Sequence, residues 1–148
     1  FVALAIVAGC AEGTRPFTLV AVCLEDQQDV AEFLQELRDE AERSGMTFTD
    51  GSEQSERDLV ALGQRSPGEF VLNVGVEQPN GYGLMAGDLH SGYQVAVGFN
   101  GDIASRDTAE ARAWADAVVA RLRERWHVET VSNPSESGAF PMSECPSA

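Results

Sequence analysis

The stretch from residue 70 to residue 100 constrains the fold most strongly, because two runs with apolar residues at every second position flank a third strand-like run. Such alternation is typical of a strand that buries one face and exposes the other. Turn sequences at residues 79–81 and 90–92 separate the runs, so consecutive strands should be antiparallel neighbours. The sequence therefore predicts a meander of three strands. The alternating apolar positions are Phe70, Leu72, Val74, Val76, Tyr93, Val95, Val97 and Phe99.

Two amphipathic helices are predicted, one before and one after this meander. The first begins with a capping-box-like pair, Asp29 and Glu32, and continues at helical spacing until Ser44-Gly45 ends it. The second repeats the pattern with Asp107 and Glu110. A shorter helix is predicted over residues 55–62. The apolar stripes of the two long helices are Val30, Phe33, Leu34, Leu37 and Ala41, and then Ala111, Trp114, Val118, Leu122 and Trp126.

Three further strands complete the predicted fold, over residues 17–24, 46–49 and 127–131. The element order is then β-α-β-(α)-β-β-β-α-β. This order predicts a single α+β domain over residues 17–131, with a mainly antiparallel sheet and two helices packed on one face. Residues 132–148 are rich in Ser, Pro and Glu, and we expect an irregular C-terminal tail there.

The second face of the predicted sheet is a candidate binding surface, because its residues are mostly small or polar. Glycine in a strand lets another backbone come close, although it can also mean only that the sheet is curved. Asn73 and Gln94 are the polar residues that we expect to contact a partner on this face. The full set of residues assigned to the face is Val71, Asn73, Gly75, Gly83, Gly87, Gln94, Ala96 and Gly98.

The chain is strongly acidic, with 24 acidic residues against ten arginines and a formal net charge of −14. Such a chain should repel nucleic acid and attract a cationic protein partner, although the charge can also serve solubility alone. The acidic run of the first helix is predicted to be its solvated side, with Glu36, Asp39 and Glu40 as possible contacts for that partner. The absence of lysine excludes Schiff-base and Ser-Lys catalysis and a Walker A lysine.

Candidate catalytic residues are few. Asp88 and His90 are two positions apart, on the same side of a predicted strand, and Ser91 follows, so the three could form a general-base or ligand site. The alternative is that they are ordinary turn residues before Gly92. The two histidines lack the spacing of a zinc site. The glycines at 81–87 lead into a strand, where a dinucleotide-binding loop requires a helix. We therefore predict neither a metal nor a cofactor.

An uncharged, mainly apolar run from Phe1 ends in Val7-Ala8-Gly9-Cys10. This ending resembles the lipobox of bacterial lipoprotein signals, where a peptidase cuts before a lipidated cysteine. The resemblance implies that residues 1–9 are the last part of a signal peptide and residues 10–16 a lipidated tether. Ala11 then favours the periplasmic face of the outer membrane, with membrane contact only through the anchor. Alternatively, residues 2–9 form a buried strand or helix.

The remaining cysteines, Cys23 and Cys145, form an even pair in an oxidising compartment if Cys10 is lipidated. We expect a disulfide that joins the two ends of the domain. The alternative is a buried free thiol at Cys23 and a loose one at Cys145.

Two functional hypotheses follow from the sequence. The first is a small acidic envelope lipoprotein that binds a protein, such as an inhibitor or immunity factor against a basic periplasmic toxin or hydrolase. This hypothesis is based on the combination of an anchor, strong acidity and no catalytic constellation. It implies that the chain is not an enzyme. The alternative is an envelope enzyme or small-ligand binder that uses the hairpin group Asp88, His90 and Ser91.

Overall fold

The computed structural model describes residues 16–79, 81–89, 92–100 and 108–131. Within these ranges the chain forms six strands and three helices. None of the three helices is long and apolar enough to cross a lipid bilayer. The elements in chain order are β1 (Thr18–Leu24), α2 (Gln27–Ser44), β2 (Thr47–Asp50), α3 (Ser52–Ala61), β3 (Asn73–Glu77), β4 (Gly83–Asp88), β5 (Tyr93–Asn100), α4 (Ala109–Arg123) and β6 (His127–Thr130).

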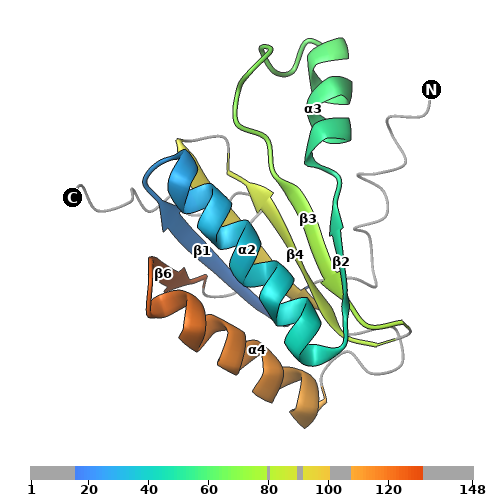
Figure 1. The fold of residues 1–148 in the computed structure, drawn as a ribbon, viewed down its shortest axis with the longest axis vertical. Coiled ribbons are helices and arrows are strands. Elements are labelled where there is room, and N and C mark those ends of the chain that lie inside the picture. The colour runs from blue at the N-terminus through green and yellow to red at the C-terminus, as the bar shows by residue number, and fades with distance from the viewer. Residues whose placement is uncertain (1–15, 80, 90–91, 101–107, 132–148) are drawn as a thin grey trace.

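The six strands form one sheet in the order β2-β3-β4-β5-β1-β6, and every neighbouring pair is antiparallel. The predicted α+β fold with an antiparallel sheet is confirmed, and so is the meander β3-β4-β5. The first strand lies between the last strand of the meander and β6, with Val20 opposite both Val97 and Thr130. Figure 1 shows α2 and α4 on one side of the sheet, and α3 beyond the ends of β2 and β3, apart from both helices.

The hydrophobic core lies between α2, α4 and one face of the sheet. Phe33 and Leu37 of α2 are completely buried, as is Leu122 of α4. The ring of Phe33 meets the edge of Trp126 with 5.9 Å between ring centroids. Each such side chain contributes roughly 2–3 kcal/mol by leaving water. The sheet supplies alternate residues of its strands, and the prediction is confirmed for those of β3 and β5. The full set is Val20, Val22, Leu24, Val74, Val76, Leu84, Ala86, Val95, Val97 and Phe99.

The helix boundaries differ from the prediction at their N-termini. The N-cap of α2 is Asp26, whose carboxylate accepts a hydrogen bond from the Asp29 backbone N–H, so this helix starts before the predicted capping pair. The N-cap of α4 is Thr108, and Asp107 lies outside the described residues. The C-terminal prediction for α2 is confirmed. Gly45 adopts φ 65° there and donates its backbone N–H to the carbonyls of the last helical turn.

The first strand of the meander is shorter than predicted, because it starts at Asn73 instead of Phe70. The backbone N–H of Leu72 donates to the carboxylate of Asp88 at 2.9 Å, so a side chain replaces a backbone acceptor at this point of the sheet. Val71, which we assigned to the second sheet face, therefore lies outside the strands. Among the described residues no helix covers that second face, which we call the helix-free face.

Candidate functional site

The acidic run of α2 does not form the solvated docking face that the sequence suggested. Glu40 is only 2% exposed. Its carboxylate accepts hydrogen bonds from the Ser44 hydroxyl at 2.6 Å and from the Trp114 indole N–H at 2.7 Å. It also pairs with the guanidinium groups of Arg43 and Arg121. The prediction of an exposed Glu40 is wrong, because it lies three residues after Leu37 and therefore on the buried stripe of the helix.

The same contacts decide the charge state of Glu40. Burial alone would raise the pKa of its carboxyl group. The hydrogen bonds from Ser44 and Trp114, together with the charges of Arg121 and Arg43, outweigh that effect and hold the pKa below the ordinary value of 4.5. Glu40 is therefore a carboxylate at neutral pH and joins α2 to α4.

Glu36 and Asp39, the other two predicted contact residues of α2, differ in their surroundings. The Glu36 carboxylate lies 3.7 Å from the Arg43 guanidinium and 3.8 Å from that of Arg121, so most of its charge is balanced inside the molecule. Asp39 is exposed and accepts a hydrogen bond from the Gln35 amide at 2.7 Å. Of the three predicted contact residues on α2, only Asp39 thus presents its charge to solvent.

Asn73 and Gln94 both lie on the helix-free face, but they do not converge on one site. The Asn73 amide donates to the Ser55 hydroxyl at 2.8 Å, and its backbone N–H donates to the Ser52 hydroxyl at 2.9 Å. Asn73 therefore fastens α3 to the sheet. Gln94 sits on β5 beside its register partner Cys23. Partner binding at this face stays a prediction.

Cys23 is disulfide-bonded and belongs to the helix-free face of β1. Its bonding partner lies outside the described residues, as do Cys10 and Cys145. The pairing of Cys23 with Cys145 and the lipidation of Cys10 therefore stay predictions.

The candidate hairpin group is only partly described, because His90 and Ser91 lie outside the described residues. Asp88 has a clear structural role. One carboxylate oxygen binds the Arg65 guanidinium at 2.6 Å and the other accepts the Leu72 N–H, with both charged side chains largely buried. Asp88 thus holds the segment after α3 against the end of β4. The described residues contain no group of three acidic, histidine or cysteine side chains that could hold a metal ion.

The connection between β2 and β3 is the feature that sequence reasoning missed. These strands are antiparallel neighbours, with Asp50 opposite Val74. Two to five residues commonly suffice to join such a pair. Here 22 residues separate Asp50 from Asn73, and they contain α3 and a loop that returns to the sheet. We call residues 51–69 the α3 arm.

The α3 arm is held by a few polar contacts and not by the core. α3 has no buried residue, whereas α2 and α4 each contribute several to the core. Besides the bonds to Asn73, the Glu56 carboxylate accepts the Gly68 backbone N–H at 3.1 Å. Leu62, at the C-terminal end of α3, is 55% exposed. The sequence predicted the short helix over residues 55–62, and the scarcity of apolar residues in this segment is the signal that indicates an exposed helix.

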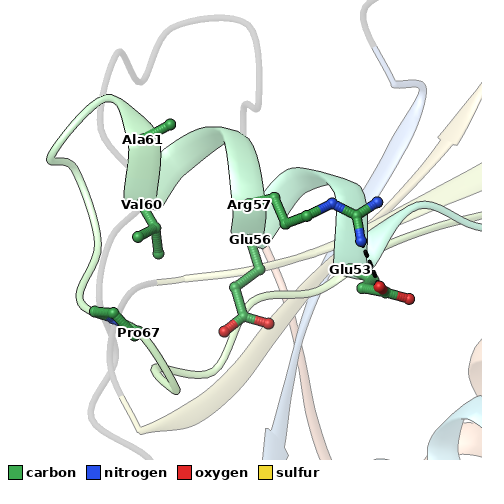
Figure 2. A pocket seen from close by; sticks show the side chains of 6 residues that line it. All are labelled: Glu53, Glu56, Arg57, Val60, Ala61 and Pro67. Atoms are coloured by element: carbon green, nitrogen blue, oxygen red, sulfur yellow. Dashed lines mark hydrogen bonds and ion pairs between the residues drawn. The ribbon is translucent and has the colours of Figure 1, made fainter.

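A hollow of about 490 Å³ lies between α3 and the returning loop, and we call it the arm hollow (Figure 2). Val60 and Ala61 of the helix and Pro67 of the loop give it apolar walls. Glu53, Glu56 and Arg57 give it a charged side. In Figure 2 Glu56 projects from the helix on the same side as Val60, while Arg57 extends along the helix to its ion-pair partner Glu53.

No protein-family model matches the sequence, and a search of curated proteins finds no match. The function must therefore be inferred from the residues and surfaces of the chain itself.

Proposed function

We propose that this protein is an acidic protein-binding module that Cys10 anchors to the bacterial envelope through lipid, and that its partner is a cationic protein. An inhibitor or immunity factor against a basic periplasmic toxin or hydrolase fits this description. The observation that carries the proposal is the unequal pairing of charges on the described surface.

The eight arginines of the described residues all have partners inside the molecule. Most pair with carboxylates, as Arg65 does with Asp88. The remainder lie over aromatic rings or donate to a hydroxyl, as Arg123 does to Thr130. The full set is Arg38 over Phe48, Arg43 and Arg121 with Glu36 and Glu40, Arg57 with Glu53, Arg65 with Asp88, Arg112 over Phe17, Arg123 with Thr130, and Arg125 with Glu32 and Glu36.

Many carboxylates, in contrast, have no cationic partner within the described residues. Asp39 and Glu42 on α2, Asp58 on α3 and Asp116 on α4 are all exposed. The excess negative charge therefore lies on the outside, where it attracts cations over roughly one Debye length, about 8–10 Å at ordinary ionic strength. Such a field accelerates the association with a basic protein and weakens that with nucleic acid.

The proposal is tested with the mature chain, immobilised through its tether and incubated with periplasmic extract in low and in moderate salt. A captured protein is identified, purified and titrated back against the chain by calorimetry. We expect a basic protein that binds one-to-one and whose Kd rises with salt, as it does for electrostatically steered complexes. If no basic protein binds, or if binding does not depend on salt, the proposal is wrong.

The anchor is tested separately by mass spectrometry of the protein from envelope fractions. We expect an N-terminal Cys10 that carries acyl chains. A protein that retains residues 1–9 and has no acyl mass would contradict lipid anchoring, and it would leave the binding proposal to the capture experiment.

A further inference from the structure

We infer that the arm hollow receives one arginine or lysine side chain of the partner, and that Glu56 pairs with its cationic head. The assignment of that side chain to a basic protein rests on the proposed function. The walls of the hollow, its unbalanced charge and the contacts that hold its loop support this inference.

The walls of the hollow suit a long side chain that has an apolar stem. Val60 and Ala61 come from the last turn of α3 and line the hollow with Pro67 of the returning loop, which lies below the Val60 side chain in Figure 2. Arginine and lysine place their methylene stems along apolar surfaces and keep the charged head in a polar environment. The carboxylate of Glu56, on the polar side of the same hollow, provides that environment.

The charges around the hollow favour a cation over an anion. Arg57 is already paired with Glu53 and donates to the Gln54 side chain at 2.8 Å, so neither member of that ion pair needs a further partner. Glu56 has no cationic partner among the described residues. One of its oxygens accepts the Gly68 N–H, which leaves the other oxygen able to accept a second donor. The arm hollow thus carries one unbalanced negative charge.

The loop that forms the far wall is held by contacts within the chain itself. Arg65 is 10% exposed and Asp88 8% exposed, and their ion pair ties the loop to the end of β4. The Glu56–Gly68 hydrogen bond ties the loop to α3. A preformed hollow lowers the conformational entropy lost on binding, which favours recognition through a single side chain.

The length of the connection also supports a recognition role. β2 and β3 need only a short turn to pair, and the α3 arm adds no side chain to the core. Long insertions in such connections commonly carry function and not stability. The arm is also acidic overall, because it contains four acidic residues and only two arginines. The acidic residues are Glu53, Glu56, Asp58 and Glu69, and the arginines are Arg57 and Arg65.

The test is a titration of the full chain with Nα-acetyl-arginine amide, followed by the backbone amide signals in nitrogen–proton NMR spectra. We expect saturable shifts that are largest at Glu56, Val60, Ala61 and Gly68. The uncharged isostere Nα-acetyl-citrulline amide should bind about tenfold more weakly, because it lacks the charge that strengthens the hydrogen bond to Glu56.

Two variants with the same change in net charge make the test specific. Glu56→Gln keeps an acceptor for the Gly68 N–H but removes the carboxylate, and should weaken binding of the arginine amide about tenfold. Asp58→Asn is the matched control. Asp58 is on α3 but outside the hollow, where it accepts from Gln54, so its loss should change Kd by about twofold at most.

Absence of saturable shifts around the hollow would overturn the inference, and so would equal losses of affinity in Glu56→Gln and Asp58→Asn, which would mean general charge attraction. The purified cationic partner from the capture experiment gives an independent result. If it binds Glu56→Gln as tightly as the natural chain, the proposed function stands and the hollow is not its contact. Specific arginine binding without any captured partner would support the hollow and contradict the proposed function.

Discussion

Ion pairs between carboxylates and arginines occur both at the α2–α4 interface and in the α3 arm, but the carboxylate of Glu40 is buried in the first region, whereas the pair within α3 is exposed. Both join acidic and arginine side chains, but Glu40 is 2% exposed, while Glu53 and Arg57 on α3 are both mostly exposed. A charge in the first environment must be fully paired, because removal from water is costly. An exposed pair contributes little, at most about 1 kcal/mol. The α2–α4 interface therefore specifies the fold, whereas the exposed charges of the α3 arm can change with little effect on it.

The largest loss of stability should follow from a substitution in the core next to α2. Replacement of Phe33, which is completely buried against Trp126, by alanine should lower the free energy of unfolding by about 4 kcal/mol. The equivalent truncation in the arm, Leu62→Ala, should cost less than about 0.5 kcal/mol because Leu62 is mostly exposed. Urea unfolding of both variants measures the difference. Similar losses would mean that the α3 arm is part of the core.

Removal of the buried carboxylate should have the next largest effect. Glu40→Ala leaves the Trp114 indole N–H and two arginines without their shared acceptor, and should cost about 3 kcal/mol. That value is at the lower end for a buried charge network, since Arg43 and Arg121 both reach solvent. Glu42→Ala, an exposed neighbour, is the control and should be nearly neutral. A neutral Glu40→Ala would show that the network does not join the helices.

Loss of the arm's tether should be smaller and local. Arg65→Ala leaves the largely buried Asp88 carboxylate with only the Leu72 N–H, which should cost about 1–2 kcal/mol. Amide hydrogen exchange should accelerate in residues 62–69 and remain unchanged in α2. Accelerated exchange throughout both segments would show that the arm and the core open together.

The smallest effect should be a pH dependence that belongs to Glu40. Its pKa is lower in the folded than in the unfolded chain, so its ionised form stabilises the fold fully above the unfolded pKa near 4.5. The stabilisation is lost as pH falls through the lowered folded pKa. The difference in unfolding free energy between the natural chain and Glu40→Gln should therefore be constant at neutral pH and shrink below pH 4.5. A difference that grows in acid would mean that folding raises the pKa of Glu40, which would contradict the lowered pKa.

The sequence predicted the elements that depend on local pattern and missed those that depend on distant partners. The alternation at residues 93–99 predicted β5 because each buried side chain meets the same face of the sheet. The apolar stripe of α2 was found in the same way. Glu40 was misplaced because a carboxylate on a buried stripe is explained only by Arg121 and Trp114, which lie more than 70 residues further along the chain.

The arm hollow was not predictable for a related reason. Its walls come from α3 and from Pro67, and their approach depends on the ion pair between Arg65 and Asp88. The spacing of Asp88 from His90 suggested a catalytic group. That spacing gives no sign of the ion pair between Asp88 and an arginine 23 residues earlier. Periodicity indicates which face of an element is buried, but not which loops meet.

If the α3 arm recognises a partner and is dispensable for the fold, a chain without the arm should fold and fail to bind. All of the arm except Gly51, residues 52–69, is replaced by a Gly/Ser linker of about four residues, together with Asp88→Asn so that no buried charge is left unpaired. We expect cooperative unfolding at a similar temperature and no detectable heat of binding when the purified cationic partner is added in the calorimeter. Binding with the affinity of the full chain would contradict the account.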